Sequence, residues 1–102
     1  MTFSEKFCLK WNDFEANITS SYQDLRKEQD FSDVTLACEG DQNIKAHKVI
    51  LAGCSSVFRK LLKQHSHPHP LLYMRGMTTK YLTAVVDFIY HGEVNTSYEY
   101  LD

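Results

Sequence analysis

The sequence is poor in several features on which enzyme sites depend. It contains only four glycines, and none belongs to a glycine-rich loop of the kind that binds phosphate groups. It also lacks the His-Glu-x-x-His motif of zinc hydrolases. Cys54, in Gly-Cys-Ser-Ser, could be a nucleophile only beside an orienting base and a cleft, whereas its apolar neighbours predict a buried, unreactive thiol. We therefore expect no catalytic residue, no cofactor and no enzymatic activity.

Cysteine is also scarce, and its spacing argues against a disulfide-bonded protein. Cys8, Cys38 and Cys54 are odd in number and far apart, and no two of them form a Cys-x-x-Cys pair. This pattern is typical of reduced thiols in an intracellular protein. Cys38 and Cys54 are expected to serve as small residues of the core.

Long apolar runs and strong charge of one sign are absent too. A membrane-spanning helix needs a run of about eighteen apolar residues, and the sequence has none. The opening segment MTFSEKFCLKWN lacks the apolar stretch of a signal peptide. The formal net charge is −2, and the densest basic cluster, Arg59-Lys60 with Lys63, is not the basic stripe of a nucleic-acid surface. We expect no membrane and no direct nucleic-acid contact.

A run of alternating histidines is the most conspicuous local motif. His65, His67 and His69 are separated by Ser66 and Pro68, and imidazole suits zinc, nickel or copper. However, structural zinc usually has four ligands in separated pairs, and this run holds no cysteine or carboxylate. The motif is therefore interpreted as a solvated loop, and no metal site is predicted. The lone His47 is likewise expected to be a packed, hydrogen-bonded residue.

The central stretch, residues 33–58, predicts a hairpin followed by two helices. Val34, Leu36 and Cys38 alternate with smaller residues as in a half-buried strand, residues 39–43 are rich in turn formers, and Ile44 and Ala46 resume the alternation. After His47 the period becomes helical, and the residues expected to be buried are Val49, Ile50 and Leu51. Gly53 should end this helix, and Ser55 or Ser56 should begin the next, whose apolar face holds Phe58, Leu61 and Leu62.

Two further apolar patterns precede the central stretch. Phe7, Leu9 and Trp11 alternate as on a short strand, whose partner must be distant in sequence or belong to another chain. Asn12 can then cap a helix, with Glu15 as its capping-box partner. This helix carries one apolar stripe, which more often packs on a core of the same chain than on a partner. The stripe consists of Phe14, Ile18, Tyr22 and Leu25.

The residues after the histidine loop predict a strand, a turn and a helix. The strand is expected at residues 71–74, the turn at Arg75-Gly76-Met77, and Thr78 or Thr79 should cap the helix. Gly92 should end that helix. The apolar face of the helix is predicted to hold Leu82, Val85, Val86, Phe88 and Ile89, with Lys80 and Asp87 in solvent. With 43% hydrophobic residues, these elements predict one small α+β domain.

Three motifs of this sequence resemble those of the BTB (POZ) domain. They are SDVTL, KAHKVILAGCSSVFRKLL and FIYHGEV, and FCLKWN resembles the FxLxWN start of the tramtrack group of insect BTB domains. The resemblance implies a cluster of helical hairpins flanked by a small mixed sheet over residues 1–102. It also implies an N-terminal exchange strand at residues 1–11 and a core at residues 12–95, with a short strand at residues 93–95 where FIYHGEV ends its helix. BTB domains usually continue with a further helical pair, so we expect the last helices to be missing from this chain.

The resemblance further implies a protein–protein interaction function. It predicts a homodimer that joins into larger assemblies, through an interface formed by Phe7, Leu9, Trp11, Phe14, Ile18, Tyr22 and Leu25. In the family the positions of Asp33 and Lys48 form a charged pocket at the dimer groove, which is implicated in binding co-repressors in some members. Many members have Arg at the second position, and Lys cannot make the bidentate contacts of Arg. From the residues alone, Asp33 and Lys48 could form a surface ion pair, which would contribute little, ~0–1 kcal/mol.

The tramtrack resemblance also implies a cellular role. It predicts the N-terminal oligomerisation domain of a nuclear transcription or chromatin regulator, whose DNA contacts come from elements outside this chain. The expected partners are the chain itself, other BTB domains of the same group and co-regulator proteins. The alternative is a substrate adaptor for a cullin-3 ubiquitin ligase, which uses the same fold.

Overall fold

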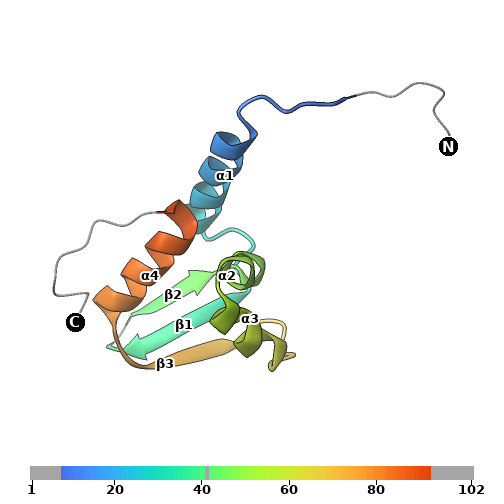
Figure 1. Ribbon diagram of the computed structural model, residues 1–102. Coiled ribbons are helices and arrows are strands. Elements are labelled where there is room, and N and C mark those ends of the chain that lie inside the picture. Colours follow the sequence, from blue (N-terminus) through green and yellow to red (C-terminus); the bar gives the residue numbers. More distant parts are fainter. Residues whose placement is uncertain (1–7, 41, 93–102) are drawn as a thin grey trace.

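A computed structural model of the chain describes residues 8–40 and 42–92 (Figure 1). These residues form four helices and three strands. In chain order the elements are α1 (Phe14–Glu28), β1 (Val34–Glu39), β2 (Asn43–Ala46), α2 (Lys48–Cys54), α3 (Ser56–Lys63), β3 (Leu71–Thr78) and α4 (Thr79–His91). The predicted α+β class is confirmed. The predicted strand at residues 93–95 lies outside the described residues.

The three strands form one small mixed sheet in the order β2-β1-β3. β1 and β2 are antiparallel, with Val34 opposite Ala46 and Leu36 opposite Ile44, which confirms the predicted hairpin. β3 runs parallel to β1. A parallel neighbour requires a long crossover, and here α2 and α3 make this connection (Figure 1).

β1 is buried along most of its length, on both faces of the sheet. The sequence predicted a half-buried strand, and this prediction was wrong, because Thr35 and Ala37 are buried along with the apolar residues between them. β1 lies between β2 and β3, so side chains from both neighbouring strands shield Thr35 and Ala37 from solvent. Thr35 Oγ1, for example, lies 2.9 Å from His69 Nε2.

A single apolar core joins the sheet to three of the helices. Alternate residues of β1, together with Leu72 of β3, pack against side chains from α2, α3 and α4. Because strand residues two apart share one face, this core lies on one side of the sheet. Its fully buried large side chains are Val34, Leu36, Leu51, Leu82 and Val86.

Local capping chemistry fixes several helix boundaries as predicted. Ser55 Oγ accepts a hydrogen bond of 3.3 Å from the Phe58 N–H and begins α3, and Thr78 Oγ1 accepts one of 3.2 Å from the Tyr81 N–H and begins α4. Gly92 ends α4 with φ of 82°, a left-handed conformation that glycine adopts without steric cost. These caps fix where α3 begins in the connection between β1 and β3, and where α4 begins and ends.

Three predicted boundaries were wrong. Asp13, not Asn12, precedes α1, and its side chain makes no capping hydrogen bond. Gly53 lies inside α2, which instead ends where Ser55 becomes extended. The expected turn at residues 75–77 is an irregularity within β3: Cys38 pairs with Met74 and Glu39 with Thr78, so three residues of β3 are left without a partner on β1.

A buried hydrogen-bond network connects α4 to the start of α2. The Tyr90 hydroxyl accepts a bond of 2.9 Å from the His47 backbone N–H and lies 2.7 Å from His47 Nδ1. His47 Nε2 lies 2.7 Å from the Asp30 carbonyl oxygen, which can only accept. Nε2 therefore carries the proton, and Nδ1 accepts from the Tyr90 O–H. The structural role predicted for His47 is confirmed.

Replacing Tyr90 with Phe should destabilise the fold by about 1–3 kcal/mol, because it leaves the His47 N–H and Nδ1 buried without partners. Urea unfolding of the Tyr90→Phe variant at neutral pH would measure this loss. A matched control is Tyr81→Phe, because the Tyr81 side chain is partly exposed on the same helix. Equal stabilities of the two variants would show that the network contributes nothing.

The same tyrosine predicts a loss of stability at alkaline pH. Burial raises the pKa of Tyr90, and the hydrogen bond from the His47 backbone and the charge of Arg26 offset only part of this effect. The folded state therefore keeps the phenol proton at pH values where the unfolded chain, with a tyrosine pKa of about 10, releases it. Stability should fall as the pH rises above that value, and less steeply in Tyr90→Phe.

Candidate functional site

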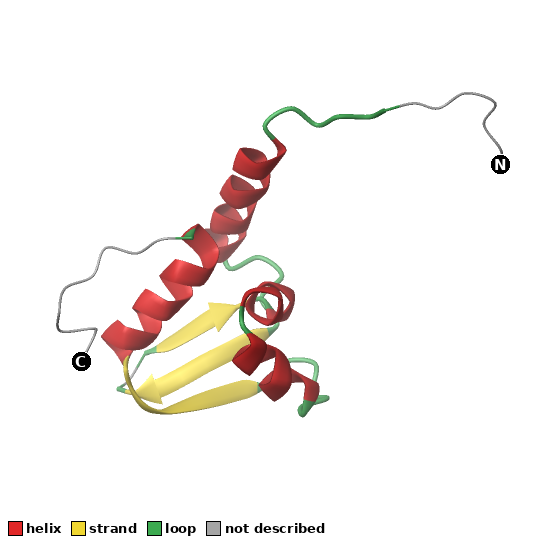
Figure 2. Cartoon of the chain, in the orientation of Figure 1, coloured by secondary structure: helices red, strands yellow, loops and turns green. Residues whose placement is uncertain are grey.

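The first helix exposes an apolar stripe. α1 buries none of its residues, and Phe14 and Tyr22 are 50% and 40% exposed, while Ile18 and Leu25 are half-buried. Figures 1 and 2 show α1 leading away from the sheet, with residues 8–13 extending further from it. The sequence left open whether this stripe packs on its own core. In the structure, α1 lies outside that core.

α1 is held to the rest of the domain near its C-terminal end. Arg26 forms an ion pair with Asp87 of α4, and its guanidinium carbon lies 5.4 Å from the centre of the Tyr90 ring. Asp87 was predicted to stay in solvent, which was wrong, because α1 brings this cation beside it. The pair could not be found from the sequence, since its two residues are 61 positions apart. This attachment leaves the N-terminal part of the stripe uncovered by α4.

The segment before α1 is extended and free of strand pairing in the described residues. Leu9 and Trp11 are exposed, and the Trp11 ring makes an edge contact with Phe14, with 5.0 Å between the ring centres. Phe7 lies outside the described residues. A strand at residues 7–11 would need a neighbouring strand, so this part of the predicted interface stays a prediction.

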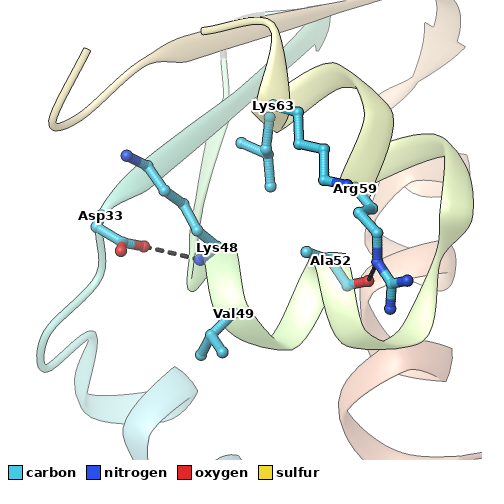
Figure 3. Close-up of a pocket in the computed structure, with 7 residues that line it drawn as sticks. Asp33, Lys48, Val49, Ala52, Arg59 and Lys63 are labelled. Carbon is cyan, nitrogen blue, oxygen red and sulfur yellow. Dashed lines mark hydrogen bonds between the residues drawn. The ribbon is translucent and has the colours of Figure 1, made fainter. Parts of the chain in front are cut away.

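Asp33 and Lys48 lie together, but they do not form the ion pair that the sequence suggested. Asp33 Oδ1 accepts a hydrogen bond of 2.8 Å from the backbone N–H of Lys48, at the first residue of α2 (Figure 3). The Lys48 ammonium instead donates to the His67 carbonyl oxygen at 3.0 Å. Asp33 therefore binds one of the unpaired backbone N–H groups at the start of the helix.

These two residues line a shallow pocket between α2 and α3. Figure 3 draws the residues that line it as sticks. Val49, predicted to be buried, is 78% exposed here, because only the opposite side of α2 faces the core. Arg59 and Lys63 were missed as pocket residues, although their spacing of four along a helix places them on one face. The lining residues are Asp33, Lys48, Val49, Ala52, Arg59, Leu62 and Lys63.

Cys54 lines a separate, mostly apolar hollow between α3 and α4. Its predicted burial was wrong, since the residue is exposed, whereas Cys38 is buried as expected. Phe88 was expected on the buried face of α4 and is also exposed, on the rim of this hollow. Both errors have the same cause. The spacing of apolar residues predicts which face of a helix is apolar, but not how much of that face the small core of the domain buries.

The histidine loop takes part in structural contacts. In addition to the contact of His69 with Thr35, His67 Nδ1 accepts a hydrogen bond of 2.9 Å from the His69 backbone N–H. Among residues 8–40 and 42–92, no three His, Cys, Asp or Glu side chains are grouped to hold a metal ion. No helix in these ranges is both long enough and apolar enough to cross a membrane.

The described residues thus form a small α+β domain with a partly exposed apolar stripe on α1 and a basic pocket, as in a protein-interaction module. A sequence profile of the BTB/POZ domain matches residues 22–102. The chain belongs to the BTB/POZ family, which confirms the resemblance seen in its motifs.

Several Drosophila melanogaster proteins are similar to this chain over nearly its whole length. Longitudinals lacking protein-like is 46% identical over 99% of the chain and 79% of its own length. Broad-complex core protein is 48% identical over 93% of the chain, and the alpha isoform of tramtrack is 39% identical over 96%. The chain spans only 13% and 12% of the lengths of these last two proteins.

Among solved structures, the BTB domain of zebrafish PATZ1 has a similar fold. The two superpose with a TM-score of 0.78 over 92% of this chain and 76% of that one. Their sequences are 24% identical, so this likeness supports the BTB fold and nothing more specific.

Proposed function

We propose that this domain self-associates and is the oligomerisation domain of a nuclear transcription or chromatin regulator. In this proposal α1 forms the dimer interface, the N-terminal segment joins dimers into larger assemblies, and DNA is bound by elements outside the chain. The resemblance to the tramtrack group supports the cellular role. Other BTB domains of the same group are proposed as further partners through the same surfaces.

The observation that carries the proposal is the partly exposed apolar stripe of α1, with Phe14 and Tyr22 50% and 40% exposed. A 15-residue helix with four regularly spaced large apolar residues buries none of its residues in its own chain. Contiguous apolar patches on soluble domains usually mark interaction sites. If a second copy laid its α1 against this one around a two-fold axis, the contact would be self-complementary and would close as a dimer.

The N-terminal segment is proposed as the second contact. Residues 8–11 are not paired as a strand with any other described residue, and the Leu9 and Trp11 side chains are exposed. An extended segment of this kind can add as a strand to the sheet edge of another subunit. The dimer contact and the strand contact use different surfaces, so together they can build assemblies larger than two.

Deleting residues 1–11 should therefore remove the larger assemblies and leave α1 available for dimer formation. Sedimentation velocity on the deleted form would measure the change. The matched control deletes only residues 1–6 and keeps the apolar segment 7–11, so it should retain the larger assemblies. If both deleted forms behave like the full chain, the segment is not an assembly contact.

The pocket at Asp33 and Lys48 is proposed as a second kind of site, for co-regulator proteins. Its lining residues are Asp33 and residues of α2 and α3, and Figure 1 shows these two helices away from the N-terminal end of α1. A domain could thus hold its own copy and a different protein at once.

A further inference from the structure

The histidine loop, residues 65–70, joins α3 to β3 (Figure 1) and is held from two sides. On one side, the Lys48 ammonium at the start of α2 donates a hydrogen bond of 3.0 Å to the His67 carbonyl oxygen. On the other side, His69 Nε2 lies 2.9 Å from the hydroxyl oxygen of Thr35 in β1. The histidines of this loop therefore take part in the contacts that fix it, although the loop lies at the surface.

One hydrogen bond inside the loop requires an uncharged histidine. His67 Nδ1 accepts from the His69 backbone N–H at 2.9 Å. A neutral imidazole has one nitrogen that accepts, whereas both nitrogens of the charged ring carry protons and only donate. Protonation of His67 would therefore direct two N–H groups at each other. The contact is present while the ring is neutral and is lost when the ring is charged.

The contact of His69 with β1 also favours a neutral ring. The Lys45 ammonium, which can only donate, lies 3.5 Å from Thr35 Oγ1. The Thr35 hydroxyl can therefore accept from Lys45 and donate its own proton to His69 Nε2. If His69 were protonated, two cations would be directed at one oxygen. The neighbouring backbone bond, 3.0 Å from the Thr35 N–H to the Pro70 carbonyl oxygen, lies at the same end of the loop.

The charges around the loop are mostly positive. Asp33 brings a carboxylate to Lys48, but one of its oxygens is bound to the Lys48 backbone N–H. Residues 42–86 contain no aspartate or glutamate. Because like charges repel, positive charge gained by the loop histidines weakens the hold of the surrounding elements on the loop. The basic side chains on these elements and in the loop itself are Lys45 of β2, Lys48 of α2, Lys60 and Lys63 of α3, and His65.

We propose that the histidine loop is an acid-sensitive latch. Neutral His67 and His69 hold the loop against α2 and β1, and protonation of both rings releases it, together with the Lys48 ammonium. Histidine side chains ordinarily gain their charge at about pH 6.5. Because the closed loop favours the neutral rings, its contacts are present above this pH and are lost as the pH falls through it. The latch does not depend on self-association or on a ligand.

Nuclear magnetic resonance of the isotope-labelled full chain, titrated from about pH 8 to about pH 5, tests the latch. The backbone order parameters of the loop amides should be about 0.85 at the upper end of this range and below about 0.6 at the lower end. The amide signal of His69 should shift with the same midpoint as the ring signals of His67, because the ring accepts from that amide.

Two variants separate the latch from general effects of charge. In the double variant His67→Asn with His69→Gln, the side-chain amide oxygens can take the place of the accepting ring nitrogens, and neither side chain titrates. Its loop should stay ordered over the whole range. The matched control is His65→Asn, which removes an exposed histidine whose side chain makes no hydrogen bond among the described residues. This control should respond to pH as the parent does.

Three results would overturn the proposal. The first is a parent loop that stays ordered at the lowest pH. The second is an equal loss of order in the parent and the double variant, or a response that disappears in His65→Asn. The third is a loss of loop order only together with helix content, measured by circular dichroism at the same pH values, which would indicate acid unfolding of the whole domain.

Discussion

Replacing Phe14 and Tyr22 with glutamate is expected to convert the proposed dimer into a monomer while the domain stays folded. The two side chains are about half exposed in the single chain, so each would lose about 1 kcal/mol of further burial at the interface. A two-fold interface contains four such side chains, which gives a total of about 4 kcal/mol. The dissociation constant should therefore rise by about three orders of magnitude, before any added charge repulsion.

The matched control places the same two substitutions on α4. Phe88→Glu with Tyr81→Glu replaces one phenylalanine and one tyrosine, 58% and 40% exposed, and adds the same charge. It should leave the dimer intact. Light scattering gives the mass of each variant, and circular dichroism shows whether helix content is kept. A monomer in the control, or a dimer in the α1 variant, would contradict the assignment of the interface to α1.

Leu51→Ala is expected to destabilise the domain by about 2–5 kcal/mol, whereas Val49→Ala should change stability by less than about 0.5 kcal/mol. The two residues are neighbours in α2, but Leu51 is fully buried and Val49 is 78% exposed. Truncating Leu51 leaves a cavity in a core that includes Leu36 and Leu82, whereas solvent already surrounds most of Val49.

Urea unfolding of the two variants at one chain concentration would measure the difference. A fixed concentration is necessary because association adds to the apparent stability of a folded chain. Similar losses of unfolding free energy in both variants would mean that α2 packs against the core with a different face from the one described. Unfolding of Val49→Ala alone would show that a partner or a further segment covers this residue.

The elements that the sequence predicted well are those set by short-range chemistry. The β1–β2 hairpin followed from alternation and turn residues, and the caps at Ser55, Thr78 and Gly92 followed from side chains and conformations available within a few residues. Such features require no knowledge of distant neighbours. For this reason most of the fold, including the presence and type of all four described helices, could be predicted before the structure.

The errors concern features that depend on what lies across space. The apolar run predicted burial of Val49, but α2 packs against the small core with one face only, and Val49 lies on the opposite face. Cys54 is exposed for the same reason. Asp33 and Lys48 were correctly placed together, yet the carboxylate binds the backbone N–H of Lys48, because the start of α2 presents that donor directly.

The candidate site was only partly open to prediction. The α1 stripe was visible as a pattern, but its exposure depends on where Arg26 and Asp87 fix the helix, which no local pattern contains. The basic pocket depends on α2 and α3 meeting at an angle that brings Arg59 over Ala52. The sequence showed Arg59 and Lys63 only as a small basic cluster.

Sedimentation velocity of the full chain over a range of concentrations tests self-association most directly. At tens of micromolar the proposed function predicts species of at least twice the 11.9 kDa mass of one chain, with larger species that disappear when residues 1–11 are deleted. A folded chain that sediments as a single 11.9 kDa species across the whole range would contradict it.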